Sequence, residues 1–131
     1  MVRFYATTTL LALLATFTAA NPITKRSRPP TTPNTQSCGA VQHSELLRYT
    51  LYIGVTYANG NGCGYIDDQL KALLEGPQGD QSGNYGGLSC QDDGNGDTLL
   101  KFSTGWDQGQ AINRLMHRIY PMVNGFNCPS K

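Results

Sequence analysis

Histidine is the residue type most often used for acid–base chemistry near neutral pH, and the chain contains only two, His43 and His117. A ribonuclease can be built from two histidines, or from histidine, glutamate and arginine, acting as acid, base and phosphate clamp. His117 is close to Arg114 and Arg118, and His43 precedes Glu45. No local motif links these groups, so a solvent-exposed helix face and a loop histidine are the stronger interpretation. We therefore expect no catalytic residues and no enzyme.

Acidic and amide side chains alternate at Asp93, Asn95 and Asp97, as they do at the start of a calcium-binding loop. The sixth position of that loop would be Thr98 rather than glycine, and the twelfth would be Thr104 rather than glutamate. A hairpin turn is the better interpretation, because Asp, Asn and Gly tolerate its backbone angles. We expect neither a metal site nor a cofactor.

Four side chains are candidates for contact with a partner. Trp106, the only tryptophan, can stack on a sugar or anchor a partner, although a tryptophan just before a helix is more often a lid on the core. Tyr52 falls on the outer face of a predicted strand, and Arg114 and Arg118 fall on the polar face of a predicted helix. We expect Trp106, Tyr52, Arg114 and Arg118 to contact a binding partner.

The N-terminal residues carry processing signals. Met1–Ala20 has an early arginine, a short apolar stretch and small residues before Ala20, which is typical of a signal peptide cleaved after Ala20. Residues 21–26 form a short pro-segment that ends in the dibasic pair Lys25-Arg26, and we predict a second cleavage after Arg26. Residues 27–37 are rich in proline and threonine, which predicts a disordered tail. Residues 38–131 then form one domain.

Charge limits the classes of partner. From residue 38 onward the chain has six Lys and Arg against nine Asp and Glu, a net charge near −3. Nucleic-acid and anionic-membrane surfaces need clustered basic residues, so we expect no nucleic-acid partner. The apolar stretch of the leader is too short to span a bilayer, and we expect no membrane insertion.

Hydrophobic periodicity predicts the elements that position these residues. Residues 48–57 alternate strictly and predict a half-buried strand, and 63–74 repeat at helical spacing before Gly76-Pro77. Residues 88–90 and 98–103 predict two strands of a hairpin. Residues 112–123 predict a second amphipathic helix disturbed by Pro121, and 124–128 a short closing strand. The fold class is α+β, a small disulfide-stapled βαββαβ-like sandwich with two helices on one face of an antiparallel sheet.

Four cysteines follow the leader, and in an exported chain an even number indicates disulfides. Four cysteines allow three pairings. The βαββαβ order favours Cys38–Cys128 with Cys63–Cys90, because it brings the chain ends together beside the sheet and places the start of the first helix above the second strand.

This order of elements, with Gly62-Cys63-Gly64 opening the first helix, Cys90 after a glycine-rich loop and Cys128 beyond the second helix, resembles the fold of fungal killer-toxin subunits. Small four-cysteine secreted effectors of plant-pathogenic fungi share that fold. The resemblance covers Cys38 to Cys128. Killer-toxin subunits have further cysteines that this chain lacks. The resemblance implies a secreted fungal protein that acts on another organism, and it carries no catalytic residues.

We therefore expect a secreted fungal effector, a cysteine-rich virulence protein that binds a host protein or another host surface molecule during colonisation without enzymatic chemistry. One alternative is a killer-toxin-like or antimicrobial protein directed against competing microbes, although the acidic domain speaks against membrane lysis. The other is a small secreted ribonuclease. We expect an extracellular monomer that acts in the host apoplast or inside the host cell.

Overall fold

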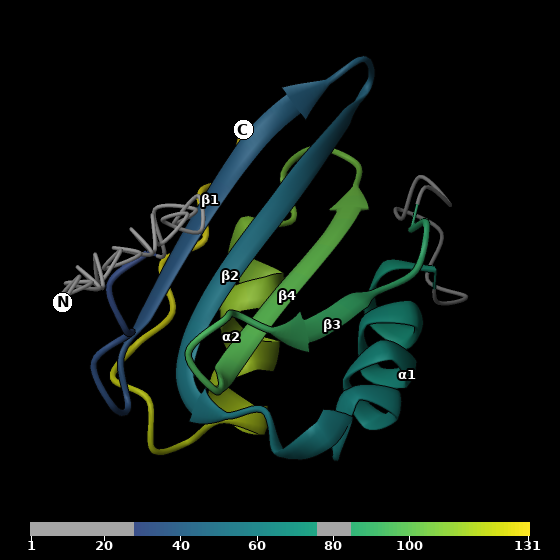
Figure 1. Cartoon of the computed structure of the whole chain (residues 1–131). Helices are drawn as coiled ribbons and strands as arrows, with labels where there is room; N and C mark the ends of the chain where they lie inside the picture. The colour runs from purple at the N-terminus through teal and green to yellow at the C-terminus, as the bar shows by residue number, and fades with distance from the viewer. Residues whose placement is uncertain (1–27, 76–84) are drawn as a thin grey trace, which may run out of the picture.

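The computed structural model describes residues 28–75 and 85–131. The leader with its cleavage sites at Ala20 and Arg26, and the predicted helix stop at Gly76-Pro77, lie outside the described residues. Within these residues there are four strands and two α-helices, with one 3₁₀ turn at Ala58–Gly60 (Figure 1). They are β1 (Gln36–His43), β2 (Leu46–Thr56), α1 (Cys63–Leu74), β3 (Ser89–Asp92), β4 (Asp97–Thr104) and α2 (Gly109–Ile119).

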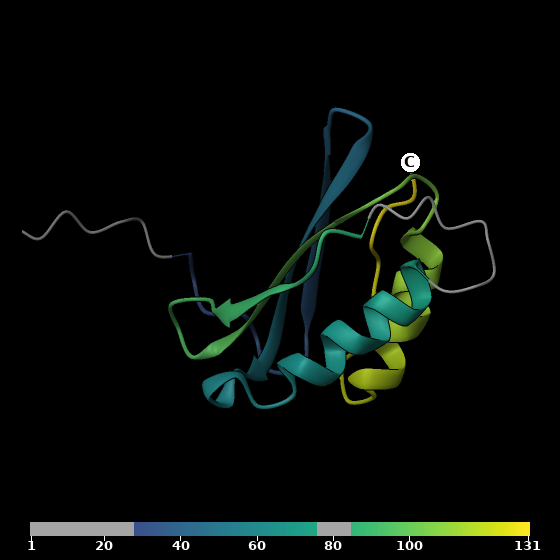
Figure 2. The ribbon, with the colours of Figure 1, turned by 90° about the vertical axis from the view of Figure 1, so that its right-hand side faces the viewer.

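The sheet is antiparallel throughout, with the order β1-β2-β4-β3. Both helices lie on one face of it, and the other face has no helix in the described parts of the chain (Figure 2). We call the helix-free side the outer face. This two-layer α+β architecture confirms the fold class predicted from hydrophobic periodicity.

The core lies between the sheet and the helices. The alternation in β2 buries Tyr49, Leu51 and Ile53 on the helix side, as predicted. The partners of Tyr49 and Leu51 on β4 are Phe102 and Leu100, which are buried on the same side. The helices contribute apolar residues at helical spacing: Ile66, Leu70 and Leu74 from α1, and Ile112, Leu115 and Met116 from α2.

The predicted closing strand at 124–128 is wrong, since those residues form no strand. Strands β2 and β3 both pair with β4, and α1 connects them, which makes a split βαβ unit. The free position beside β2 is occupied by β1, which precedes it in the chain, rather than by a strand after α2. The observed order is therefore ββαββα. Strand β1 was missed because its sequence shows no clear alternation of apolar residues; only Cys38 and Ala40 pack against the core.

The prediction of a disordered tail at 27–37 also needs correction for residues 28–37. Gln36 and Ser37 belong to β1. Before them, Asn34 and Thr35 extend the pairing: the Gly54 N–H donates to the Thr35 carbonyl and the Asn34 N–H donates to the Gly54 carbonyl. We call residues 28–35 the N-terminal arm; it lies against the outer face (Figure 2). The composition suggested a disordered tail because the arm has no apolar side chain that could anchor it in the core. Backbone hydrogen bonds hold it instead, and composition does not reveal those.

Candidate functional site

The two histidines lie in different layers of the molecule. Cys38 and Ala40 of β1 pack against the core, so alternation directs Val41 and the exposed His43 to the outer face. His117 is exposed on α2, in the helix layer. A single site that uses both imidazoles is therefore not formed.

Arg114, His117 and Arg118 form a continuous basic surface on α2, and all three are exposed. Their spacing of three and four residues places them on one helix face, opposite the buried Ile112 and Met116. They line a surface depression of about 480 Å³. We call these three residues the α2 ridge. Arg118 also lies in the last turn, where its positive charge interacts favourably with the helix dipole.

The remaining candidates for partner contact are separated from the ridge. Tyr52 lies on the outer face, and the Arg28 guanidinium is 3.6 Å from the centre of its ring. Trp106 is in the loop between β4 and α2 and is 40% exposed, so it is not a closed lid on the core. The four predicted contact residues thus do not form one surface; only Arg114 and Arg118 lie together.

Residues Asp92–Asp97 form the turn between β3 and β4, as the hairpin interpretation predicts. The Asp92 carboxylate accepts from the N–H groups of Gly94 and Gly96, and the Asp93 carboxylate accepts from those of Asn95 and Asp97. Burial, followed by the charges of Asp93 and Asp92, raises the pKa of Asp97. The acidic residues of this segment therefore serve first to fold the turn.

Both disulfides join the predicted pairs, Cys38 to Cys128 and Cys63 to Cys90. The first links β1 to the segment after α2, and the second links the start of α1 to the edge strand β3. The positions agree with the topological argument for Cys63–Cys90. For Cys38–Cys128 the chain ends do meet, although the C-terminal segment lies beneath the sheet instead of pairing in it.

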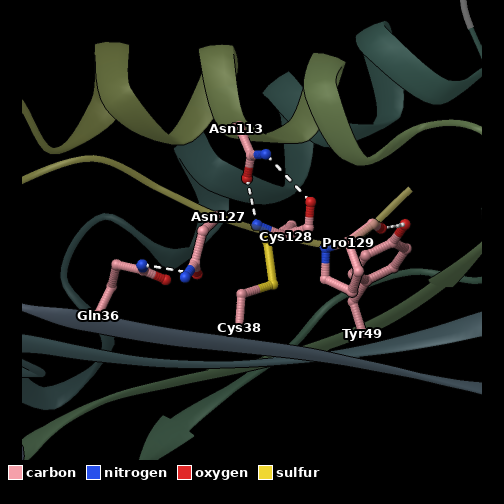
Figure 3. Close-up of a disulfide and its surroundings, with 7 residues drawn as sticks. All are labelled: Gln36, Cys38, Tyr49, Asn113, Asn127, Cys128 and Pro129. Atoms are coloured by element: carbon pink, nitrogen blue, oxygen red, sulfur yellow. Dashed lines mark hydrogen bonds between the residues drawn. A yellow bond between two sulfur atoms is a disulfide. The ribbon is translucent and has the colours of Figure 1, made fainter.

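That C-terminal segment runs between α2 and the strands, and Asn113 holds it to the helix (Figure 3). The Cys128 N–H donates to Asn113 Oδ1 at 2.6 Å, and Asn113 Nδ2 donates to the Cys128 carbonyl at 3.1 Å. On the sheet side, the Tyr49 hydroxyl donates to the Pro129 carbonyl at 2.7 Å. The sequence analysis did not single out Asn113, because its role depends on a contact with a segment that follows α2.

A second basic site, which the sequence did not reveal, lies on the outer face at the end of β4. The cavity there has a volume of about 460 Å³ and is lined by Arg48, Lys101, Ser89, Ser103, Phe102 and residues 86–88. We call it the outer-face pocket. Arg48 and Lys101 occupy the polar positions of the alternating strands, which was the available signal, but the register that brings them together is a property of the folded sheet.

Tyr85 directly precedes the pocket residues 86–88 and links them to α1. Its hydroxyl donates to Asp67 Oδ1 at 2.6 Å, and its ring packs edge-on against Phe102. Burial, together with the Asp67 carboxylate, raises the pKa of Tyr85 far above its usual value. The phenol is therefore a neutral donor that anchors this wall of the pocket.

Comparison with known proteins gave no match to any family model, curated protein or solved structure. Within residues 28–75 and 85–131, no helix is long and apolar enough to cross a membrane.

Proposed function

We propose that this chain is a secreted fungal effector that acts by binding an acidic surface of a host protein, without chemistry of its own. The α2 ridge is the observation that carries the proposal. It presents Arg114 and Arg118 in a fixed spacing on a helix whose other face is buried in the core.

Rigidity of this helix supports a binding role. Asn113, in the same helix, is hydrogen-bonded to the backbone of Cys128, which is disulfide-linked to β1. A cationic surface on a fixed element loses little conformational freedom when it meets a complementary partner. The partner that fits this ridge is a host protein with exposed carboxylates.

Export is supported by the chain's N-terminal signals and by its disulfides. The leader Met1–Ala20 and the pair Lys25-Arg26 precede a domain with two disulfides, which persist in oxidising compartments. Intact-mass analysis of culture filtrate is expected to show a chain that begins near Ser27. A dominant species that begins at Asn21 would mean that Lys25-Arg26 is not cleaved.

The test of function is a gene deletion, scored for host infection and complemented with variants of the ridge. Arg114→Ala with Arg118→Ala is expected to leave infection at the level of the deletion strain, because it removes both permanent charges. Gln110→Ala is the matched control, since Gln110 is exposed on the same helix and carries no charge. Full infection by the double variant would contradict a role for the ridge.

His117→Lys separates binding from acid–base chemistry. Lysine keeps a basic side chain at this position but does not serve as an acid–base group near neutral pH, so full activity is expected for a binding protein. Loss of activity with an unchanged circular dichroism spectrum would favour the ribonuclease hypothesis. A deletion strain that infects normally but fails against competing microbes would favour the toxin hypothesis.

A further inference from the structure

The outer-face pocket brings side chains from three strands to one place. Arg48 of β2 pairs with Ser103 of β4, and Lys101 of β4 pairs with Ser89 of β3. All four side chains point outward, because their neighbours Tyr49, Leu100 and Phe102 point into the core. Figure 1 shows α2 behind β2 and β4, so the view is onto the outer face of the sheet.

Register places the two cations in contact range of one ligand. Lys101 is two residues from Ser103, the direct partner of Arg48, so Arg48 and Lys101 are diagonal neighbours on adjacent strands. Such positions are about 7–8 Å apart at the backbone, within reach of long side chains. Two like charges at this spacing repel each other, and an anion between them would remove that cost.

The described lining of the pocket supplies donors and no carboxylate. Arg48 offers a planar guanidinium, Lys101 an ammonium, and Ser89 and Ser103 offer hydroxyls. Residues Gly86 and Gly87 form the remaining wall. Gly87 has a φ of +97°, a left-handed conformation that glycine adopts without strain.

We propose that the outer-face pocket binds a phosphate monoester, with the phosphoryl group held between Arg48 and Lys101. The two side chains supply two positive charges, and a phosphate monoester carries a charge of about −1.5 to −2 at neutral pH. The guanidinium can form two parallel hydrogen bonds to the phosphate oxygens, and Lys101 and the serines reach the others. A carboxylate would neutralise only one of the two cations.

The surroundings restrict the ligand to a small molecule. The side chain of Asp92, three residues or about 10 Å away at the hairpin end of β3, lies opposite Thr98 on the helix side of the sheet and accepts hydrogen bonds within the turn, so it does not reach the pocket. Across the Gly86–Gly87 wall, Asp67 and Lys71 of α1 and Glu75 just after it line a separate depression of mixed charge. The pocket offers two cations, which suffice for the single phosphoryl group of a phosphorylated sugar or nucleoside, whereas a nucleic acid contacts a longer row of basic residues.

This proposal is independent of the α2 ridge, which lies in the opposite layer. Its test is isothermal titration of the oxidised domain with inorganic phosphate and with glucose 6-phosphate at low ionic strength. We compare Arg48→Gln with Lys101→Gln against the control Arg114→Gln with Arg118→Gln, which makes the same change in net charge on the other face. A loss of affinity of at least about tenfold is expected for the first pair only.

The two ligands distinguish the sources of the phosphoryl group. Tighter binding of glucose 6-phosphate than of inorganic phosphate indicates an esterified phosphate, as proposed. Tighter binding of inorganic phosphate would contradict the proposal that the ligand is an ester. Equal losses in both variant pairs, or no binding by wild type, would overturn the site. Tighter binding of single-stranded RNA with a steep salt dependence would replace the proposal with a nucleic-acid site.

Thermal unfolding without ligand checks that the variants fold. The double variant Arg48→Gln with Lys101→Gln is expected to be at least as stable as wild type, because the repulsion between the two cations is removed.

Discussion

Asn113 shows how much one side chain contributes to this domain. The segment around Cys128 forms no strand, so its backbone groups need other partners, and the amide of Asn113 satisfies both a donor and an acceptor there. The disulfide alone fixes the sulfur atoms but leaves the peptide groups on either side unpaired. Asn113 therefore supplies the hydrogen bonds that a neighbouring strand would otherwise supply to the backbone of Cys128.

Asn113→Ala is expected to lower the free energy of unfolding by about 2–3 kcal/mol, because two buried backbone groups lose their partner. Urea unfolding measures the change. Asn127→Ala is the control, since Asn127 is exposed and accepts one hydrogen bond from Gln36; it is expected to change stability by less than about 0.5 kcal/mol. Similar effects of both variants would contradict this role for Asn113.

Buried tyrosines predict the response to alkaline pH. Burial raises the pKa of Tyr49, Tyr85 and Tyr120 above the ordinary value of 10.0. The unfolded chain therefore releases these protons from about pH 10, while the folded chain retains them, so stability is constant below that range and falls as pH rises through it. The melting temperature measured from about pH 8 to about pH 11 checks this.

Tyr85→Phe is expected to weaken the alkaline loss, because one raised pKa is removed, while lowering stability at neutral pH by about 1–2 kcal/mol through loss of the hydrogen bond to Asp67. An unchanged pH profile in Tyr85→Phe would show that this phenol does not titrate differently in the two states.

At the scale of elements, the N-terminal arm depends on Gly54 of β2. A Cβ at this position would lie within 2.1 Å of the Thr32 carbonyl oxygen, closer than side-chain atoms ever approach a backbone. Arg28, further along the arm, is stacked on Tyr52. The arm can therefore lie on the outer face only because residue 54 has no side chain.

Gly54→Ala is expected to displace the arm and cost about 1–3 kcal/mol, with the sheet retained. Amide hydrogen exchange should become faster at Asn34, whose N–H donates to the Gly54 carbonyl. Gly39→Ala on the neighbouring strand is the control, because its Cβ would meet no atom within 4 Å. Protection of Asn34 that survives Gly54→Ala would show that the arm is held elsewhere.

Elements with a strong pattern could be predicted from the sequence, and those with a weak pattern could not. β2 buries one face completely, so its alternation is clear, and α1 and α2 repeat their apolar residues at helical spacing. β1 is an edge strand that offers only Cys38 and Ala40 to the core and leaves Val41 70% exposed, so its sequence gives no alternation. Arg48 and Lys101 were each recognisable as outward-facing, but their proximity depends on the pairing of β2 with β4.

For the whole molecule, the disulfides are expected to provide a large share of stability. Their cysteines are 90 and 27 residues apart, for which the chain-entropy model gives about 4.6 and 3.6 kcal/mol. The free energy of unfolding of a small domain is only about 5–15 kcal/mol in total. The contribution of each disulfide is therefore comparable to a large part of the free energy of unfolding.

Cys63→Ser with Cys90→Ser is expected to leave a largely unfolded, protease-sensitive chain that no longer acts on its target, and full reduction is expected to do the same. Limited proteolysis and circular dichroism measure the outcome. A double variant that keeps the denaturation midpoint of the oxidised protein would show that packing of α1 against the sheet suffices without the bond.

The position of the C-terminal segment between α2 and β1 also sets an order of events in folding. Strand β1 can pair with β2 early, because the two are joined by a short turn, but the layer beneath β1 is completed only when residues near Cys128 arrive. Contacts across so long a stretch of chain form slowly. A chain synthesised only as far as α2 would expose the underside of β1, so oxidation of Cys38 before Cys128 is available would risk pairing with the wrong cysteine. We therefore expect the arrival of the last segment, rather than the pairing of the first strand, to limit how fast this domain matures.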